Sequence, residues 1–381
     1  MDQKLNNSIA FVCSSTSWGG LEMNVVRRAN AFSKRSWSVV VFAVDGGKIF
    51  EEAKRLGLNT IAIKKQNRYY SFAAAFRLAK LFKLHKVKAA MFMDTRDMSM
   101  LATVKWRLNN RLALLYQQNM QFGRRIKRDF LHTQRFKKID AWITLLPFMK
   151  EQLQKMTRLN MDKVHMIPFG VEVEKFSLKN VRREEACARM NIDAQYKYVG
   201  IMGRLGPKKR QLFVINAFGK IHKEHPNTRL LIVGDATKDE GDDYRNKLLE
   251  ACKENEIIDK VIFKPHDNPT TFFACIDVFV MSSLAETFGM VTPEAMIAGK
   301  PIIGSKSAGT QDILGNGEFG YLFETEDLDD LAEKIKHVLG NKEEANEMAS
   351  KAQQHAIKTF SFEHEMDQLE DLVKSLSPTF R

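Results

Sequence analysis

The sequence predicts an α/β protein made of two doubly wound parallel-sheet domains. Apolar, strand-like segments alternate with helical segments along the chain, an order typical of parallel strands joined by helical crossovers. A chain of 381 residues is long enough for two domains of ordinary size. A single sheet of about thirteen strands would be unusually wide, so two sheets fit the pattern better.

The predicted strands of the first half are short apolar runs, as expected for strands that are buried on both faces of a sheet. They are 8–14, 37–44, 59–64, 88–93, 111–117, 140–146 and 163–168. Helical patterns lie between these strands, most clearly at 20–35 and 71–85.

The second half repeats this order. Its predicted strands are 196–203, 229–235, 260–265, 277–282, 301–305 and 320–323, and its predicted helices are 209–225, 241–256, 327–339 and 342–358. A turn with Pro168 and Gly170 separates the halves, so we place the domain boundary there, between residues 1–169 and 170–360. Ligands of such sheets bind at the carboxyl ends of strands, and two facing domains predict a site in the cleft between them.

The composition is that of a globular protein, with 44% hydrophobic and 28% charged residues. The chain contains no run of 18 apolar residues, so we expect no transmembrane helix. The N-terminal segment lacks a basic start followed by an apolar core, so we expect no secretory signal. The cysteines are scattered without metal-ligand spacing, which favours a reducing compartment without structural zinc; they are Cys13, Cys187, Cys252 and Cys275.

Charge is divided unevenly between the halves. Residues 1–169 hold 31 Lys and Arg against 11 Asp and Glu, a net charge of +20, whereas residues 170–381 hold 28 against 35, a net charge of −7. The densest basic stretch is 123–138, and smaller clusters are Lys64, Lys65 and Arg68, and Lys80, Lys83, Lys86 and Lys88. Three interpretations stay open: a solvated basic helix face, a surface for anionic lipid or a lipid-linked substrate, and a nucleic-acid surface. Few aromatic residues interleave the stretch, which argues against binding of single-stranded nucleic acid.

Two carboxylates, Glu286 and Glu294, flank a loop and a helix start between two predicted strands. We expect Thr292 to be the N-cap, Pro293 the first helical residue and Gly299 the helix stop. The free N–H groups of such a loop and helix start form an anion site. Carboxylates beside it would repel a bare phosphate but suit a ligand with both phosphate and hydroxyl groups, such as a nucleotide sugar.

Simpler interpretations of the two carboxylates are also open. Glu294 could only complement the helix dipole, although this leaves Glu286 unexplained. A carboxylate pair for acid–base hydrolysis is a further option.

Two further loops follow predicted strands and open helices. Gly19 and Gly20 allow close backbone approach to a phosphate at a helix start, or they form only a turn. Arg204 and Lys209, in 203-GRLGPKKR-210, can converge on a pyrophosphate as a guanidinium fork and a point charge, or they are exposed to water.

Taken in order, these pieces resemble the retaining glycosyltransferases of the GT-B fold, specifically glycosyltransferase family 4. The matching pieces are the Gly19-Gly20 loop, the turn 164–176, the loop 203–210 and the segment ETFGMVTPE at 286–294. The resemblance implies two Rossmann-like domains that face each other across a cleft. The first, 1–169, would bind the acceptor and the second, 170–360, the nucleotide sugar, while a C-terminal helix at about 361–381 packs back onto the first.

The resemblance also implies roles for single residues. Glu294 would hold the ribose hydroxyls of the nucleotide. Glu286 would hold hydroxyls of the donor sugar or stabilise positive charge near its anomeric carbon. Arg204 and Lys209 would neutralise the departing diphosphate. The backbone around the donor would come from Gly19, Gly20, Gly289, Met290 and Val291.

The chain departs from the family pattern at several places. Arg210 replaces the Gly after the basic loop, and Phe169 and Glu172 replace the Asn and Asp of the turn. The family often carries a His after the strand that ends near residue 117, and here Gln118 or Asn119 takes that place. Either amide can hydrogen-bond a sugar without transferring a proton. We expect three other histidines to be ordinary surface or strand residues: His132, His165 and His266.

The predicted activity is transfer of a sugar from a nucleotide-diphosphate donor to an acceptor hydroxyl, in the synthesis of cell-envelope polysaccharide or lipopolysaccharide. The expected acceptor is a lipid-linked or membrane-associated saccharide, and the expected location is the cytoplasm, on the inner face of the membrane. No cofactor and no metal are expected, because the cationic side chains and the helix dipole supply the positive charge, and no nucleic-acid partner is expected. The alternatives are a nucleotide-sugar epimerase of the same fold and a non-catalytic polyanion-binding protein.

Overall fold

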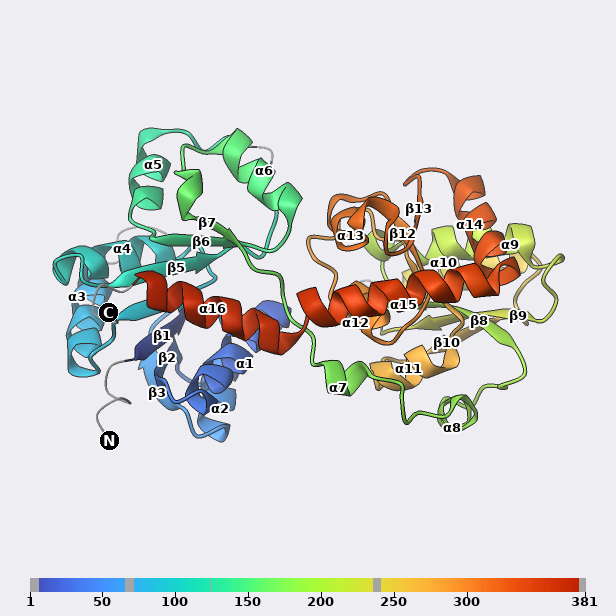
Figure 1. The fold of residues 1–381 in the computed structure, drawn as a ribbon, viewed down its shortest axis with the longest axis horizontal. Coiled ribbons are helices and arrows are strands. Elements are labelled where there is room, and N and C mark those ends of the chain that lie inside the picture. Colours follow the sequence, from blue (N-terminus) through green and yellow to red (C-terminus); the bar gives the residue numbers. More distant parts are fainter. Residues whose placement is uncertain (1–6, 66–71, 124, 236–240, 377–381) are drawn as a thin grey trace. The chain divides into compact units, whose positions relative to one another are not determined.

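The computed structural model describes residues 7–65, 72–123, 125–235 and 241–376. The basic residues Arg68 and Arg124 lie outside the described residues, as does the end of the last predicted helix, 377–381. The chain divides into two compact units: a first unit of residues 1–168 and 365–381, and a second unit of residues 169–364 (Figure 1). Each unit is built around one parallel sheet.

The first unit contains a seven-stranded sheet in the order β3-β2-β1-β4-β5-β6-β7. Its neighbouring strands are all parallel, and each predicted segment of the first half forms a strand. The strands are β1 Ser8–Cys13, β2 Ser38–Val44, β3 Asn59–Ile63, β4 Ala89–Phe92, β5 Ala113–Gln117, β6 Ala141–Thr144 and β7 Val164–Met166.

Helices cover both faces of this sheet. Leu78 and Phe82 of α3 and Leu101 of α4 join an apolar core with Val12 and Phe42 of the sheet. On the other face Phe32 of α1 packs on Phe11 of β1, with ring centroids 5.8 Å apart. The helices are α1 Gly20–Lys34, α2 Lys48–Arg55, α3 Phe72–Leu84, α4 Asp97–Arg107, α5 Phe130–Lys137, α6 Pro147–Met156, the 3-10 turn η2 Met161–Lys163, and α16 Phe362–Leu376.

The basic stretch 123–138 is not one exposed helix. Helix α5 begins only at Phe130, where the carboxylate of Asp129 accepts a hydrogen bond from the His132 amide. Before it, Lys127 forms an isolated parallel bridge with Thr157, and its amide donates to Met156 O at 2.8 Å. This bond ties the segment to the end of α6.

The second unit contains a six-stranded parallel sheet in the order β10-β9-β8-β11-β12-β13. Each predicted segment of the second half forms a strand. The strands are β8 Lys197–Met202, β9 Thr228–Val233, β10 Val261–Lys264, β11 Val278–Met281, β12 Ile302–Ser305 and β13 Tyr321–Phe323.

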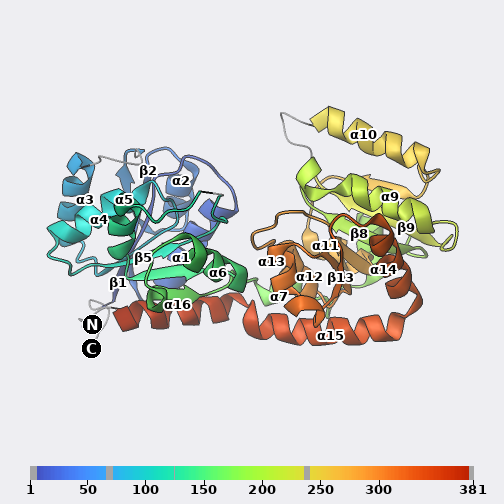
Figure 2. The same cartoon turned by 90° about the horizontal axis from the view of Figure 1, so that it is seen from above.

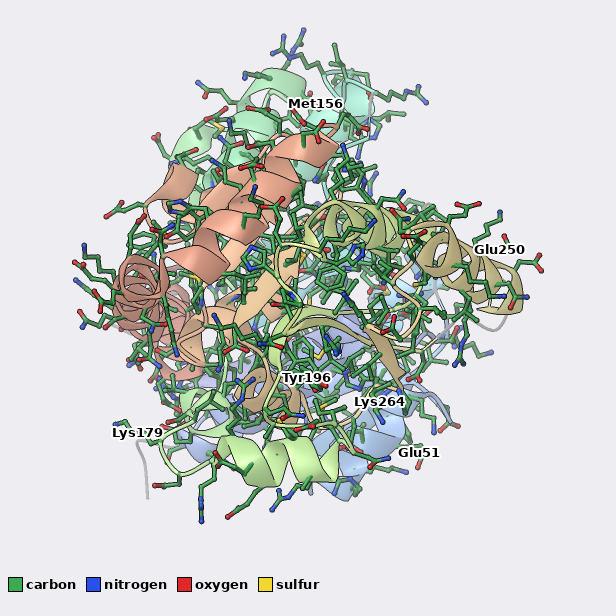
Figure 3. All side chains as sticks on the ribbon, turned by 90° about the vertical axis from the view of Figure 1, so that its right-hand side faces the viewer. Glu51, Met156, Lys179, Tyr196, Glu250 and Lys264 are labelled. Carbon is green, nitrogen blue, oxygen red and sulfur yellow. The ribbon has the colours of Figure 1, made fainter. Side chains whose placement is uncertain are left out.

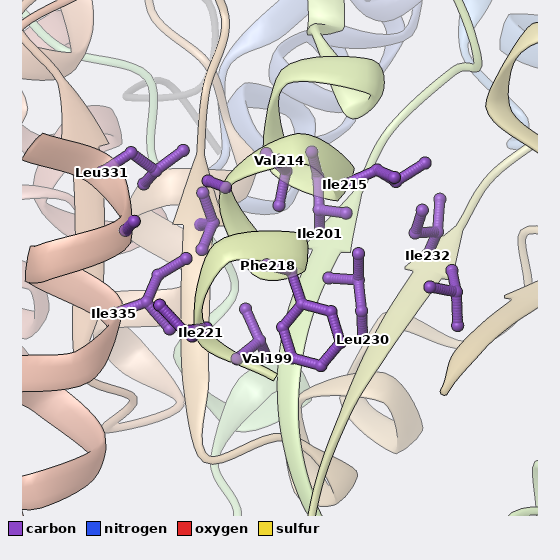
Figure 4. Packing of buried hydrophobic residues seen from close by; sticks show 14 of the residues in the cluster. Val199, Ile201, Val214, Ile215, Phe218, Ile221, Leu230, Ile232, Leu331 and Ile335 are labelled. Atoms are coloured by element: carbon purple, nitrogen blue, oxygen red, sulfur yellow. The ribbon is translucent and has the colours of Figure 1, made fainter. Parts of the chain in front are cut away.

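Helices α9, α10 and α14 cover one face of this sheet, with α9 next to both others (Figure 2). Phe218 of α9 packs with Val199, Leu230 and Ile335 in the core below them (Figure 4). The helices are α7 Val173–Phe176, α8 Arg183–Arg189, α9 Gln211–Ile221, α10 Gly241–Glu254, α11 Pro269–Cys275, α12 Val291–Ile297, α13 Ala308–Ile313, α14 Leu328–Gly340 and α15 Lys342–Thr359, with 3-10 turns η3 Pro207–Lys209 and η4 Gly315–Gly317. Charged side chains such as Lys179 and Glu250 lie at the outer surface (Figure 3).

The strands at the sheet edges are less buried than the sequence predicts. β3, β7, β10 and β13 end the two sheets, and each is buried only in part. Their apolar runs resemble those of central strands, but an edge strand has a neighbour on one side only. The prediction of burial made for the strands of the first half is therefore wrong for β3 and β7.

The chain passes from the first unit to the second after Pro168 and returns after His364. Beside these crossings two segments are hydrogen-bonded to each other. The Val171 amide donates to Phe360 O at 2.7 Å, and the Phe362 amide donates to Val171 O at 2.9 Å. A Cβ on Gly170 would lie 2.4 Å from Phe362 Cα, so only glycine fits this backbone contact.

Helix α16 is fixed to the first unit by a buried ion pair. Arg28 Nε of α1 donates to Glu365 Oε1 at 2.6 Å, and the two side chains are 0% and 1% exposed. The same guanidinium donates to the side-chain oxygen of Gln117 at the end of β5. Buried charges need such partners, which explains why α16 lies against α1.

No helix among the described residues combines the length and the apolar character that a bilayer-spanning helix needs.

Candidate functional site

In the second unit, the loops after β8 and β11 leave the carboxyl ends of neighbouring strands. They carry Lys209 and Glu286, whose Nζ and Oε2 atoms lie 2.6 Å apart. Both side chains are partly exposed, 32% and 21%, so a ligand can reach them. The hydroxyl of Ser282 donates to Lys209 O at 2.8 Å and holds the two loops together. The structure therefore brings together two of the residues that the sequence predicts to act together.

The Glu286 loop is shaped by two glycines. Gly289 has a φ of +66°, and a Cβ there would lie 2.5 Å from Glu286 Cγ. At Gly309, in the first turn of α13, a Cβ would lie 2.4 Å from Glu286 O. Gly309 is not among the residues predicted from the sequence, where its only signal is an Ala-Gly pair soon after the strand 301–305.

The helix after this loop begins earlier than predicted. α12 starts at Val291 with Met290 as its N-cap, and the Thr292 amide donates to Gly289 O at 2.9 Å. Thr292 is therefore not the N-cap, because the left-handed turn at Gly289 starts the helix before Thr292. The Thr292 hydroxyl is buried without a partner among the described residues. Gly299 has a φ of +67°, as a helix stop requires.

This helix start determines where the other predicted donor residues lie. Gly289, Met290 and Val291 stand at the beginning of α12, where backbone amides lack intrahelical acceptors. Glu294 is half-buried in the first turn.

Arg204 and Arg210 differ in their surroundings. Arg204 is exposed after β8, and its carbonyl accepts a 3.0 Å bond from Gln211 Nε2. Arg210 has a φ of +56°, the left-handed conformation that favours the Gly of the family pattern. Its guanidinium lies 3.8 Å from the ring centroid of Phe213 and pairs with Glu326 at 3.5 Å. Arg210 therefore faces partners other than the Lys209–Glu286 pair, and burial lowers the pKa of its guanidinium.

Phe169, which stands where the family pattern has Asn, packs on the Glu286 loop. Its ring lies 5.5 Å from that of Phe288, and Phe288 lies 5.9 Å from Phe360 in turn. These three rings connect the Glu286 loop to the hydrogen-bonded segments at 171 and 360–362. The substitution thus supplies packing in place of an amide.

In the first unit, Gly19 and Gly20 form the start of α1, as predicted. The Gly19 amide already has a partner, because Glu22 Oε2 accepts its hydrogen bond at 3.1 Å. Glu22 Oε1 also accepts a 2.7 Å bond from the Ser15 hydroxyl. An acidic side chain therefore occupies part of the predicted phosphate site, while a Cβ on Gly20 would meet nothing within 4 Å.

A cavity of about 350 Å³ lies at the carboxyl ends of β1, β4 and β5 in the first unit. Gln118 and Asn119 both line it, in different ways. Gln118 Oε1 accepts from Trp142 Nε1 at 2.9 Å, and its Nε2 donates to Met120 O at 3.0 Å. Both ends of the buried Asn119 amide lack a partner among the described residues. Other lining residues include Glu22, Asp94, Arg96, Tyr116, Phe122, Lys127, His132 and Arg135.

His132, which we expect from the sequence to be an ordinary surface or strand residue, also lines this cavity. Its Nδ1 lies 2.6 Å from Asp129 Oδ2. Next to the cavity, burial raises the pKa of the Asp97 carboxyl from 3.8 to about 6. Sequence spacing could not reveal either feature, because β4, β5 and α5 meet only in the fold.

Among the residues that the structure describes, no group of three or more His, Cys, Asp or Glu side chains could hold a metal ion. The expectation that no metal is needed stays a prediction.

Comparison with known proteins identifies two family matches that together cover most of the chain. Residues 18–175 match the model of Glycosyltransferase Family 4, and residues 182–355 match the model of Glycosyl transferases group 1. The trehalose synthase of Pyrococcus horikoshii is 25% identical over 339 residues, which are 86% of this chain and 75% of that protein. The lipopolysaccharide 1,2-N-acetylglucosaminetransferase of Salmonella typhimurium is 30% identical over 226 residues, 57% of this chain and 58% of that protein.

The fold is shared with a solved structure. The crystal structure of Anabaena HepE in complex with UDP is similar with a TM-score of 0.82 and 18% identity, covering 97% of this chain and 100% of that chain. At this identity the likeness shows the fold, which is GT-B. The matches and the two parallel sheets together show that the chain belongs to glycosyltransferase family 4, a family of retaining glycosyltransferases with the GT-B fold.

Proposed function

We propose that this chain transfers a sugar from a nucleotide-diphosphate-sugar donor to a hydroxyl group of an acceptor saccharide, with retention at the anomeric carbon. The observation that carries this proposal is the Lys209–Glu286 pair, 2.6 Å apart at the carboxyl ends of β8 and β11. Ligands of parallel sheets bind at such ends. A cation and a carboxylate side by side suit a ligand that carries both phosphate and hydroxyl groups.

In this proposal the second unit binds the donor. Glu294 holds the ribose hydroxyls, and Glu286 holds hydroxyls of the sugar or stabilises positive charge at its anomeric carbon. Arg204 and Lys209 neutralise the diphosphate as it leaves, the electrostatic effect that usually contributes most to catalysis. The amides of Gly289, Met290 and Val291 lie near sugar and phosphate.

The reaction breaks the bond between the anomeric carbon and the diphosphate oxygen. The acceptor hydroxyl attacks the anomeric carbon from the face that the diphosphate leaves, so the configuration is retained. The proton of this hydroxyl passes to the departing phosphate. The residues of the site stabilise charge, and no protein base takes the proton.

We assign the acceptor to the first unit, and specifically to its cavity. The buried amide of Asn119 offers a donor and an acceptor for sugar hydroxyls, and Phe122 adds an apolar surface to the same cavity. The acceptor class is a lipid-linked or membrane-associated saccharide of cell-envelope polysaccharide or lipopolysaccharide synthesis. The resemblance to a lipopolysaccharide N-acetylglucosaminetransferase supports it, as does the net charge of +20 in residues 1–169. The protein would act in the cytoplasm, on the inner face of the membrane.

The test is a transfer assay guided by donor binding. A thermal-shift series with UDP-, GDP-, ADP- and CDP-sugars selects the donor, since a ligand at about 100 times its Kd stabilises by about 2.7 kcal/mol. With that donor, we expect Glu286→Gln to lower transfer at least about 100-fold. The control Glu324→Gln, which removes a carboxylate paired with exposed Lys306, should retain activity. Full transfer by a folded Glu286→Gln protein would refute the mechanism.

The same assay separates the alternatives. An epimerase converts the donor without acceptor, whereas a transferase forms product only with one. A polyanion-binding protein binds polyanions in a salt-dependent way and is unaffected by substitutions at Glu286 and Glu294.

A further inference from the structure

The segment that leads into α5 exposes large apolar side chains to solvent. Met120, Ile126, Phe130 and Leu131 are 72%, 59%, 73% and 69% exposed. Soluble proteins seldom expose several large apolar side chains within a dozen residues, and such clusters mark interaction sites. Ile126 lies next to Lys127, which is hydrogen-bonded to the end of α6, and Phe130 and Leu131 are the first two residues of α5.

Basic residues alternate with these apolar side chains. Residues 120–138 contain seven Lys or Arg against one acidic residue, Asp129, and Asp129 is bonded to His132. Arg125, Lys137 and Lys138 are exposed. Arg128 serves the fold instead, because its guanidinium donates to Lys155 O at 2.8 Å.

Further exposed apolar side chains line a groove beside α5. A groove between α3, α4 and α5 is lined by Phe72, Trp106, Arg135 and Lys138, and the two aromatic residues are 57% and 60% exposed. The three helices lie together in the first unit (Figure 1). We call Met120, Ile126, Phe130 and Leu131, together with the side chains that line this groove, the α5 edge.

We propose that the α5 edge docks on an anionic phospholipid bilayer by inserting its apolar side chains between head groups, while its Lys and Arg side chains contact the lipid phosphates. This inference rests on the proposed function, since it names how the enzyme reaches a membrane-associated acceptor. A protein partner of matching apolar surface would not need so dense an excess of one charge. Amphipathic segments that are rich in Lys and Arg and also carry Trp, Phe and Leu bind at bilayer interfaces through apolar burial and electrostatic attraction together.

Docking at the α5 edge would place the membrane next to the cavity that we assign to the acceptor. Met120, Phe122, Lys127 and Arg135 also line the cavity that we assign to the acceptor. A bilayer at the α5 edge therefore borders this cavity. A lipid-linked sugar could enter the cavity while its lipid chain stays in the membrane.

The experiment measures binding of the full-length protein to vesicles by sedimentation. We expect binding to phosphatidylcholine vesicles that contain phosphatidylglycerol, and much weaker binding to phosphatidylcholine alone. The double variant Phe130→Ser/Leu131→Ser should weaken binding to the anionic vesicles by about tenfold or more, because two apolar side chains no longer leave water. The matched control Leu84→Ser removes an equally exposed leucine (72%) from the far end of α3 and should bind as the unchanged protein does.

Salt distinguishes insertion from simple adsorption. High salt screens the attraction between the basic side chains and the lipid phosphates. If apolar side chains insert, the unchanged protein should keep some binding at high salt, and the Phe130→Ser/Leu131→Ser variant should lose it. Equal binding by the double variant and the unchanged protein would overturn the proposal, as would an equal loss in the Leu84 control. Thermal melting should show that all three proteins are folded, since exposed substitutions have small effects. The Glu286→Gln transfer assay is run without vesicles, on a water-soluble acceptor saccharide, so failure of docking and failure of the proposed reaction are told apart.

Discussion

A Cβ placed on Gly309 would lie 2.4 Å from the carbonyl oxygen of Glu286, so α13 packs backbone to backbone on the Glu286 loop. We expect Gly309→Ala to displace this loop, lowering the free energy of unfolding by about 1–3 kcal/mol and transfer activity by about tenfold or more. Urea unfolding and initial rates measure the two effects. Gly340→Ala is the control, because a Cβ there meets nothing within 4 Å. An unchanged Gly309→Ala protein would show that the loop tolerates the displacement.

The Arg28–Glu365 pair predicts a large effect on stability. Both side chains are at most 1% exposed, so Glu365→Gln leaves a buried guanidinium without its carboxylate. We expect this substitution to lower the free energy of unfolding by about 3–5 kcal/mol, measured by urea unfolding. Asp367→Asn should have little effect, because this carboxylate is 63% exposed beside Arg35. Equal effects of the two substitutions would contradict the role of burial.

Gln118 and Asn119 should give opposite phenotypes. Gln118→Ala removes the acceptor of Trp142 and the bond to Met120 O, so it should lower the free energy of unfolding by about 1–3 kcal/mol. Asn119→Ala removes a buried amide that has no partner among the described residues, so stability should hold or rise. The same change should raise the KM for the acceptor and leave donor binding unchanged. An unaltered acceptor KM would remove Asn119 from the acceptor site.

Asp97 predicts a stability that depends on pH. Its folded pKa is raised by burial to about 6 from 3.8, so the unfolded state loses its proton first as the pH rises. The Asp97 carboxyl therefore has no effect on the free energy of unfolding below about pH 4, and it lowers this free energy progressively between about pH 4 and pH 6. Its full effect above that pH is about 3 kcal/mol, at 1.36 kcal/mol per pKa unit.

The Asp97→Asn protein checks this effect. We expect it to be more stable than the unchanged protein at pH 8 and nearly equal to it at pH 4, by urea unfolding at both pH values. If the two proteins differ in stability by the same amount at both pH values, ionisation of the Asp97 carboxyl does not destabilise the folded state.

The sequence predicts most of what local pattern determines. Every predicted strand exists, because apolar runs between helical segments are specific for parallel sheets. Lys209 and Glu286 meet as the sequence suggests, because loops at the carboxyl ends of neighbouring strands must lie together. The Thr292 cap was wrong for a local reason: Gly289 can adopt a left-handed turn and start the helix earlier.

What the sequence could not predict depends on contacts between distant segments. Arg28 and Glu365 are separated by 337 positions, and each alone is an ordinary surface-type residue. Gly309 matters only because α13 returns to the Glu286 loop. The apolar character of the α5 edge was also hidden, since Phe130 or Leu131 in a sequence is more often a core residue than an exposed one.

The return of α16 to the first unit has a practical consequence for work with fragments. A polypeptide that stops at residue 168 would omit Glu365 and the rest of that helix. The buried Arg28 guanidinium would then lack its carboxylate partner. The amino-terminal half should therefore express poorly by itself. Supplying residues 362–376 as a separate peptide, or fusing them to the truncated piece, should rescue its solubility.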